Sequence, residues 1–115
     1  MKNERKMTLS VVIPCYQSAK TLKTVVEELL AAEARITEII LVDDGSPDQV
    51  WRVIETLHEE HRLIKCVRFS RNFGQHAALM AGYRQATGDY IITMDDDGQS
   101  DPAGIAKLIA KLAEG

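Results

Sequence analysis

Three consecutive aspartates, Asp95 to Asp97, are the residues of this sequence that most clearly indicate a ligand-binding or reactive site. Adjacent carboxylates repel one another, and a hard divalent cation such as Mg²⁺ or Mn²⁺ removes that repulsion because it prefers oxygen ligands. In an extended chain, residues two positions apart point the same way. We therefore expect Asp95 and Asp97 to share one cation while Asp96 turns aside. Gln99 has the same parity and is expected to add a neutral oxygen, which leaves positions for the phosphate oxygens of a substrate.

A second interpretation of the acidic run is a solvated turn that caps the next helix. Asp101 and Pro102 follow the pattern of an N-cap and a first helical residue, so Asp101 is expected to cap rather than bind. The stretch DDDGQSD also has a faint likeness to a calcium-binding loop, but it lacks the closing glutamate. We favour the cation site because the acids directly follow an apolar run, 89–94, that is typical of a buried strand.

Asp43 and Asp44 form a second acidic pair. A carboxylate can accept hydrogen bonds from the N–H edge of a base such as uracil or guanine, so we expect at least one of the two to contact a base or ribose. The alternative is that Asp43 caps a loop and Asp44 faces water. Arg71 is a candidate partner for a diphosphate because its guanidinium offers a forked pair of donors. A surface arginine paired with a nearby acid is the alternative there.

The elements that position these residues are indicated by the apolar pattern. Near-continuous apolar runs, which suit parallel strands covered on both faces, occupy 9–14, 38–43, 63–69 and 89–94. Helical spacing or an alanine-rich composition predicts helices near 22–30, 50–57, 73–86 and 105–112. Alternating strands and helices predict a three-layer, Rossmann-like α/β fold with a mostly parallel sheet and right-handed crossovers.

In such a sheet, ligands bind beyond the carboxyl ends of the strands. The first, second and fourth apolar runs lead into 14–18, 43–46 and 95–99, so these groups are expected along one edge. The helix after the second run is predicted to start with Ser46 as its N-cap, Pro47 at its first position and Gln49 in a capping box.

Composition narrows the function classes. At 115 residues the chain is expected to form one domain, 9–115, behind a short flexible lead-in, 1–8. A net charge of −3 gives no basic patch of the kind that nucleic-acid binding needs. No apolar run approaches the roughly 20 residues of a membrane span, and the start is not typical of a secretory signal. Cys15 and Cys66 lack metal-ligand spacing and are expected to be buried free thiols, which favours a cytoplasmic location.

Three segments together resemble family 2 glycosyltransferases. They are VVIPCYQSAKTL, LVDDGSPD and the long block RFSRNFGQHAALMAGYRQATGDYIITMDDDGQSDP. The resemblance runs from Ser10 to the last helix and is strongest to the branch of dolichyl-phosphate mannosyltransferases and bacterial polyprenyl-phosphate sugar transferases. It implies a nucleotide-diphospho-sugar donor bound in a fold of the GT-A type.

The resemblance also implies roles for individual residues. Pro14 and Tyr16 match the loop that packs on the base and ribose. Asp44 matches the base-reading acid, and Asp43 beside it is a second candidate for that role. Arg71 matches a basic position beside the diphosphate. The metal-binding D-x-D corresponds to Asp95 and Asp97, joined by Gln99, and Asp96 between them is counted with the donor-binding residues.

The sequence departs from the family pattern at three places. Gln17 and Ser18 stand where the family usually has Asn and then Glu, so no base or ribose contact is carried over to Ser18. Gly98 replaces a common Leu, and Ser100 with Asp101 replaces a common His-Pro pair. The metal-binding pattern survives these changes, but they leave the subfamily open.

The reaction implied by the resemblance is inverting sugar transfer, in which Asp97 and Arg71 are catalytic because charge grows on the departing diphosphate. The implied acceptors are a polyprenyl or dolichyl phosphate, which is already ionised, or a cell-envelope glycan, which needs a general base from further along the chain. We expect this chain to be the N-terminal part of a longer enzyme at the cytoplasmic face of the membrane, truncated after its fourth βα unit. Alone, it should bind donor weakly, transfer sugar poorly or not at all, and pair as a homodimer through an exposed sheet edge.

Three other functions stay open at this point. A nucleotide-sugar-binding module without activity would keep the same residues. A receiver-like signalling domain would place its acidic pair after the first strand and a lysine after a later one, and the sequence does neither. Another Mg²⁺-dependent phosphotransfer enzyme would be expected to carry a GxxxxGK[ST] loop, which is absent from the sequence.

Overall fold

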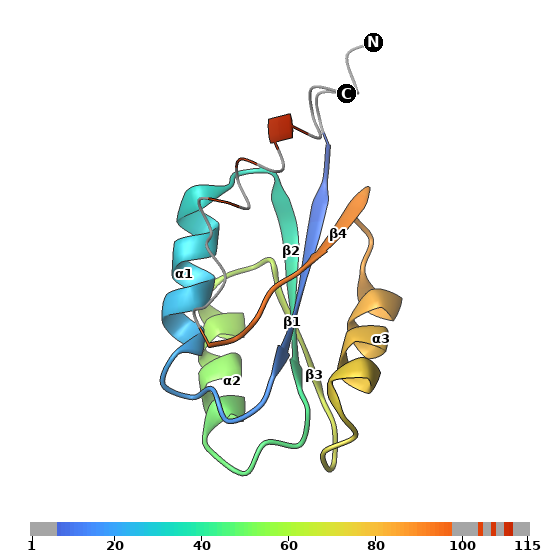
Figure 1. The fold of residues 1–115 in the computed structure, drawn as a ribbon. Helices are drawn as coiled ribbons and strands as arrows, with labels where there is room; N and C mark the ends of the chain where they lie inside the picture. Colours follow the sequence, from blue (N-terminus) through green and yellow to red (C-terminus); the bar gives the residue numbers. More distant parts are fainter. Residues whose placement is uncertain (1–6, 98–103, 105–106, 108–109, 112–115) are drawn as a thin grey trace.

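A computed structural model of the chain describes residues 7–97 together with 104, 107, 110 and 111 (Figure 1). The strands are β1 (Leu9–Cys15), β2 (Ile36–Asp43), β3 (Ile64–Arg68) and β4 (Tyr90–Thr93). The helices between them are α1 (Leu22–Ala32), α2 (Val50–Glu60) and α3 (Gln75–Gln85). All three strand pairings are parallel and the order is β3-β2-β1-β4, so the predicted α/β fold with a parallel sheet is confirmed.

Parts of four predictions fall outside the described residues. They are residues 1–6 of the lead-in, Gln99 as the third metal ligand, Asp101 as an N-cap, and residues 105, 106, 108, 109 and 112 of the last helix. In the region of the predicted last helix, the four described residues (104, 107, 110 and 111) are helical. Within the described part of the chain, no helix has both the length and the apolar character that crossing a membrane requires.

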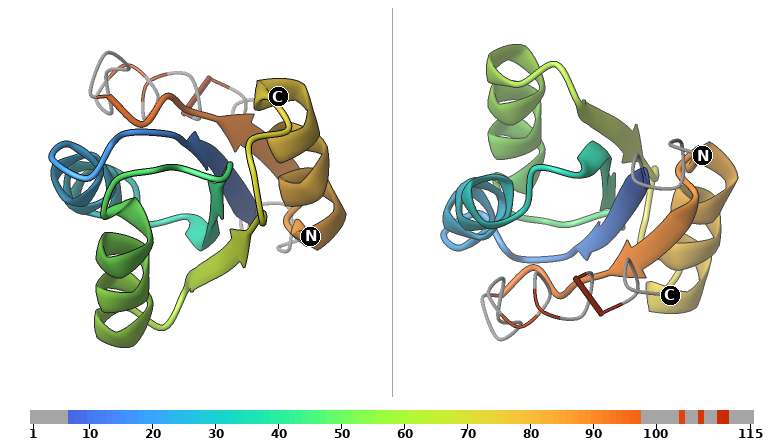
Figure 2. Two further views of the ribbon diagram at one scale, coloured as in Figure 1. Left: turned by 90° about the horizontal axis from the view of Figure 1, so that it is seen from below. Right: turned by 90° about the horizontal axis from the view of Figure 1, so that it is seen from above.

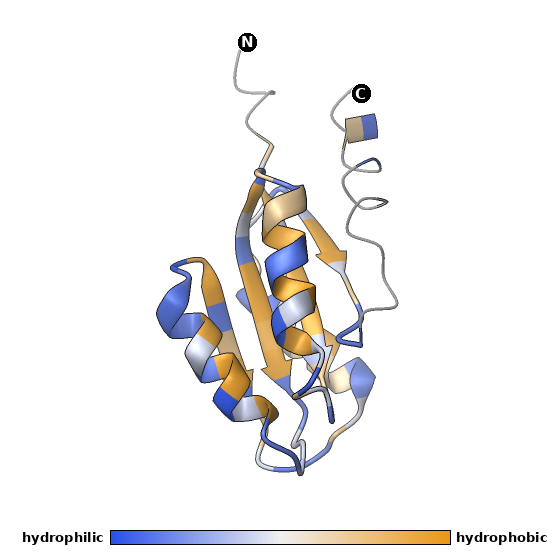
Figure 3. Cartoon of the chain, turned by 90° about the vertical axis from the view of Figure 1, so that its left-hand side faces the viewer, coloured by the Kyte–Doolittle hydropathy of each residue, from blue (hydrophilic) through white to orange (hydrophobic). Residues whose placement is uncertain are grey.

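The sheet lies between two helical layers. Helices α1 and α2 cover one face and α3 covers the other (Figure 2). Successive residues of a strand point to opposite faces, and Val11 and Ile13 accordingly pack with α1 and α2, whereas Val12 packs with α3. The hydropathy colouring reflects this arrangement, since the strands are apolar and the outer helix surfaces are polar (Figure 3).

Helix α3 approaches the sheet closely because its inner face is made of small residues. Ala78 and Gly82 are its two buried positions. A Cβ added at Gly82 would lie 2.3 Å from Cγ1 of Val12, so only glycine permits this packing distance. The alanine-rich composition that predicted a tightly packed helix thus brings the start of α3, at Gln75, against the ends of β1 and β2.

The start of α2 differs from the prediction. The helix begins at Val50, and Gln49 makes no side-chain capping bond. The Ser46 hydroxyl is already engaged, because it accepts the Gln17 N–H at 2.8 Å and donates to Asp48. Asp48 takes over the capping, with its Oδ1 accepting the Val50 N–H at 3.1 Å. Ser46 therefore holds a neighbouring loop instead of starting the helix.

The buried Glu38 and the half-exposed Lys65 form an ion pair near the end of the sheet where the strands begin. Glu38 of β2 is 3% exposed, and it accepts the Ser10 hydroxyl and both the N–H and the hydroxyl of Thr87. Lys65 of β3 lies 2.5 Å from its other oxygen. Burial opposes ionisation of Glu38, but the bonds from Lys65, Ser10 and Thr87 outweigh it and lower its pKa to about 2. This cluster attaches the α3–β4 connection to the three other strands and so sets where β4 begins.

Candidate functional site

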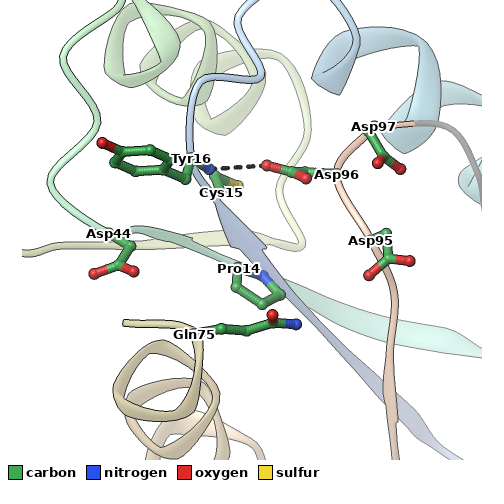
Figure 4. A pocket seen from close by; sticks show the side chains of 8 residues that line it. All are labelled: Pro14, Cys15, Tyr16, Asp44, Gln75, Asp95, Asp96 and Asp97. Atoms are coloured by element: carbon green, nitrogen blue, oxygen red, sulfur yellow. Dashed lines mark hydrogen bonds between the residues drawn. The ribbon is translucent and has the colours of Figure 1, made fainter. Parts of the chain in front are cut away.

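A pocket of about 260 Å³ lies at the carboxyl edge of the sheet, where the topology predicts a ligand site. It is shown in Figure 4, and its lining residues come from the ends of β1, β2 and β4 and from the start of α3. They are Pro14, Cys15, Tyr16, Asp44, Gln75, Asp95, Asp96 and Asp97. Six of the residues singled out from the sequence therefore share one pocket, although they come from segments about 80 residues apart along the chain.

The segment after β1 presents an aromatic ring to this pocket. Tyr16 is 43% exposed, while Cys15 beside it is fully buried and lies at the end of the strand. Burial, reinforced by the carboxylates of Asp96 and Asp43, raises the pKa of the Cys15 thiol well above its usual value. Cys15 is thus an inert wall of the pocket, and Tyr16 is the side chain available for stacking.

Asp95 and Asp97 follow β4, but the chain bends at Asp96 and Asp97, so the extended chain assumed in the prediction does not continue through them. Both are exposed, and in Figure 4 Asp96 points toward Tyr16, whereas the carboxylates of Asp95 and Asp97 do not. Two carboxylates with room for water and phosphate oxygens match the ligand chemistry of Mg²⁺ and Mn²⁺. The donor set therefore fits a divalent cation of this type.

One other group of potential metal ligands is found in the described part of the chain. Glu27, Glu60 and His61 bring their ligand atoms within 4.8 Å of one another. Glu60 ends α2, which runs antiparallel to the strands, so this group lies toward the opposite edge from the pocket. Exposed acids commonly gather in this way without an ion, and nothing connects the group with the pocket.

Asp44 is not the water-facing residue of the alternative interpretation, because it is only 4% exposed. Its Oδ1 accepts the Phe73 N–H at 2.8 Å, and its Oδ2 accepts the Gly74 N–H at 3.1 Å and the Asn72 amide at 3.2 Å. The next residue, Gly45, has φ +65°, and an added Cβ would lie 2.1 Å from the carbonyl carbon of Arg71. The turn after β2 and the loop after β3 are therefore locked together, with Asp44 at their junction.

Asp43 faces a different neighbourhood. Its Oδ1 accepts the Ser46 N–H at 2.8 Å, which is the loop-capping contact of the alternative interpretation, and its Oδ2 lies 3.7 Å from Nε of Arg68. Burial raises the pKa of Asp43, and the Ser46 amide and the Arg68 guanidinium offset only part of that rise. Asp43 lines an adjacent pocket of about 360 Å³ with Arg68, so of the two acids only Asp44 reaches the pocket that holds Tyr16.

Arg71 is the one described candidate that the structure leaves outside both of these pockets. It is exposed, and its guanidinium carbon lies 4.8 Å from the centroid of the Phe73 ring, a cation–π contact. Among the residues that the structure describes it makes no salt bridge, and its contact with a diphosphate stays a prediction. A diphosphate contact requires the side chain to leave the Phe73 ring.

Gln75 is a lining residue that sequence reasoning did not single out. It is the first residue of α3, and its amide points across the pocket beside Pro14 in Figure 4. A sequence signal was present, because Gly74 marks the start of the helix and helix starts at this edge of an α/β sheet face the ligand.

Comparisons with known proteins agree with this geometry. The model of the family described as "Glycosyl transferase family 2" matches residues 10–115. The undecaprenyl-phosphate 4-deoxy-4-formamido-L-arabinose transferase of Pectobacterium carotovorum is 43% identical over 93% of this chain and 34% of its own length. The enzyme of the same name from Photorhabdus laumondii is 40% identical and aligns with the whole chain and 37% of its own length. The chain thus spans about a third of the length of these curated relatives.

Solved structures show the same fold at low sequence identity. The mannosyltransferase PcManGT from Pyrobaculum calidifontis, in complex with GDP-Man and Mn²⁺, has a TM-score of 0.81 and 22% identity over 93% of this chain and 32% of its own. S. aureus TarS 1-349, in complex with UDP-GlcNAc, has a TM-score of 0.78 and 23% identity over 94% and 32% of the two chains. The fold is therefore of the expected GT-A type, and the chain belongs to glycosyl transferase family 2.

Proposed function

We propose that the pocket between Tyr16 and Asp95 binds a nucleotide-diphospho-sugar, and that the whole protein transfers the sugar to a polyprenyl phosphate. The observation that carries the proposal is the meeting of an exposed aromatic ring, a buried acid and two exposed acids in one pocket at the carboxyl edge of the sheet. A base would have Tyr16 and Asp44 as partners there, a cation would have Asp95 and Asp97, and the bound cation would in turn be the partner of the diphosphate.

The donor would lie with its base near β1 and β2 and its diphosphate toward β4. Pro14 and Tyr16 offer packing surface for the base and ribose, and Asp44 is better placed than Asp43 to accept a base N–H because it lines this pocket. Asp95 and Asp97 would hold Mg²⁺ or Mn²⁺ beside the diphosphate, with Gln99 as the predicted third ligand. The complex of PcManGT with GDP-Man and Mn²⁺ supports a cation in a related protein.

The chain's own part in the reaction is to bind and orient the donor. When bound, the cation would supply neutralisation of the negative charge that grows on the departing nucleoside diphosphate. Asp95 and Asp97 would fix the position of the cation, and Tyr16 would hold the nucleoside still while the bond to the sugar breaks. Arg71 is a second candidate for the diphosphate, provided that its side chain leaves Phe73.

The acceptor is proposed from the relatives, whose names specify an undecaprenyl phosphate. A phosphate oxygen is already ionised at neutral pH and can attack without a strong general base. A cell-envelope glycan is the alternative acceptor. Since the chain spans about a third of these relatives, we place the acceptor site in the part they have beyond it, and the reaction at the cytoplasmic face of a membrane.

Calorimetric titration with UDP-, GDP- and dTDP-sugars, with and without Mn²⁺, tests the donor proposal. At least one of these donors should bind, and more tightly with Mn²⁺ present. The 115-residue chain should transfer little or no sugar to undecaprenyl phosphate, whereas a full-length protein should transfer it. The proposal fails if none of the three donor classes binds with Mn²⁺ present.

We also propose that two copies pair along β4. This strand has β1 as its one neighbour in the described sheet, and Tyr90 and Ile91 on it are 43% and 45% exposed. Unpaired strand edges with apolar side chains invite pairing with another chain. Sedimentation velocity should show association that increases with concentration, and an Ile91→Lys variant should remain monomeric.

A further inference from the structure

Asp96 stands between the two acids proposed to hold the cation, yet its polar groups face the loop that follows β1. Its Oδ2 accepts the Tyr16 N–H at 2.8 Å, and its carbonyl oxygen accepts the Thr21 hydroxyl at 2.7 Å. These two bonds join segments 80 and 75 positions apart in the sequence. Asp96 therefore connects the acidic segment after β4 with both ends of the β1–α1 loop.

The rest of that loop is held by side chains from the β2–α2 loop. The Gln17 N–H donates to the Ser46 hydroxyl at 2.8 Å, and the Ala19 N–H donates to Oδ2 of Asp48 at 3.0 Å. Gln17 has φ +54°, an uncommon conformation for a residue other than glycine, so the loop depends on these outside contacts for its shape. Of the side chains that hold it, Asp96 is the one that holds the Tyr16 amide.

The side chain of Asp96 is not directed like those of its neighbours. Figure 4 shows it pointing to the backbone nitrogen of Tyr16, whereas the carboxylates of Asp95 and Asp97 do not point there. Its burial is also intermediate, whereas Asp95 and Asp97 are exposed. A third cation ligand would be expected to share the direction of the other two. A positioning role accounts for both its direction and its hydrogen bond.

We infer that Asp96 is a positioning residue, one that holds Tyr16 where its ring can stack on the donor base and so connects the base end of the pocket to the cation end. The inference rests on the proposed function, since it assumes that a nucleotide occupies the pocket. It separates three adjacent aspartates into two that contact the cation and one that shapes the pocket.

Hydrogen exchange at the Tyr16 amide tests the contact without any ligand. Asp96→Ala removes the acceptor, so exchange of that amide should accelerate by about tenfold, the usual worth of one charge-assisted hydrogen bond. Asp96→Asn keeps a side-chain oxygen and should restore most of the protection. Asp95→Ala, one residue away, is the matched control and should leave exchange at Tyr16 unchanged.

Binding measurements then separate positioning from ligation. Mn²⁺ alone, followed by electron paramagnetic resonance, should bind Asp96→Ala within about twofold of the wild type, whereas Asp95→Ala should bind it much more weakly. UDP or GDP in the presence of Mn²⁺ should lose about three- to tenfold in affinity for Asp96→Ala, and Asp96→Asn should recover most of that loss.

Two results would overturn the inference: unchanged exchange at Tyr16 in Asp96→Ala, or a loss of Mn²⁺ affinity as large as that of Asp95→Ala. Failure of the proposed function would look different, because the wild type itself would then bind neither Mn²⁺ nor nucleotide. In that event the exchange rate at Tyr16 still decides whether Asp96 holds this loop.

Discussion

Two sets of acids lie at the same edge of the sheet and serve different purposes. Asp44, after β2, is 4% exposed and surrounded by N–H donors of the loop after β3. Asp95 and Asp97, after β4, are exposed on the wall of the pocket. Exposure to solvent separates the two sets, because a carboxylate enclosed by several N–H groups helps to hold the fold even where it also lines the pocket. An acid on an exposed segment stays accessible to a ligand.

The sharpest way to break this comparison is to remove Asp44. In Asp44→Ala the Phe73 and Gly74 amides and the Asn72 side chain lose their acceptor in a nearly buried place. We expect the free energy of unfolding to fall by about 3 kcal/mol, since buried donors left without a partner are costly. Urea unfolding followed by circular dichroism measures the change.

Asp95→Ala is the control for that experiment, because it alters an exposed acid at the same edge. Its free energy of unfolding should stay within about 0.5 kcal/mol of the wild type. Equal losses in the two variants would show that the acids do not differ in the way the structure indicates.

The converse change removes the exposed pair. In the double variant Asp95→Asn and Asp97→Asn, two neutral amides replace the charged ligands that a divalent cation prefers. The gain in nucleotide affinity on adding Mn²⁺ should fall by about 100-fold, a loss of about 2.7 kcal/mol, while stability is kept. Calorimetry with and without Mn²⁺ measures it. If Mn²⁺ still raised the nucleotide affinity of the double variant as much as that of the wild type, Asp95 and Asp97 would not be the cation ligands.

The unfolding free energy at acid pH tests a second buried acid, Glu38, which lies at the end of the sheet away from the pocket. Its folded pKa of about 2 lies below the unfolded value of 4.5, so its stabilisation is present above pH 4.5 and is lost as the pH falls through 2. We expect a loss of about 2 kcal/mol, less than the full shift because Lys65 is half exposed and its charge is screened.

Glu38→Gln isolates this contribution from those of other acids. Asp43 changes the stability in the opposite direction as the pH falls, because its pKa is raised in the folded state and protonation then favours the fold. The difference in unfolding free energy between wild type and Glu38→Gln should therefore shrink as the pH falls from 4.5 to 2. A difference that does not change over this range would contradict the assignment.

The strands and the position of the acids could be predicted from the sequence for a physical reason. A near-continuous apolar run such as SVVI is stable as a strand only when both faces are covered, which implies helices on each side. Parallel strands then bring their carboxyl ends to one edge, so Tyr16, Asp44 and Asp95 had to lie near one another. The alternation of an extended chain does not apply at Asp96, because the chain bends at Asp96 and Asp97.

What could not be predicted depends on contacts between loops. The bonds from Asp44 to Phe73 and from Asp96 to Tyr16 join segments 29 and 80 residues apart, and no local pattern encodes them. The predicted start of α2 was wrong for the same reason, since the Ser46 hydroxyl is taken by the Gln17 amide. The contact of Arg71 with the ring of Phe73, two positions later, was likewise not predicted.

Asp48 is the intermediate case, and it gives the smallest expected effect. It is exposed, and it accepts the Ala19 and Val50 amides and the Ser46 hydroxyl. Despite the opposing effect of its slight burial, these bonds lower its pKa. Asp48→Ala should reduce the free energy of unfolding by about 1 kcal/mol, the usual cost of a lost cap, because water can replace the carboxylate at exposed donors. Urea unfolding measures this, and Mn²⁺ affinity should not change. If Asp48→Ala lost as much unfolding free energy as Asp44→Ala, accessibility to water would not determine the cost of removing an acid in this fold. The number of hydrogen bonds alone would then determine it.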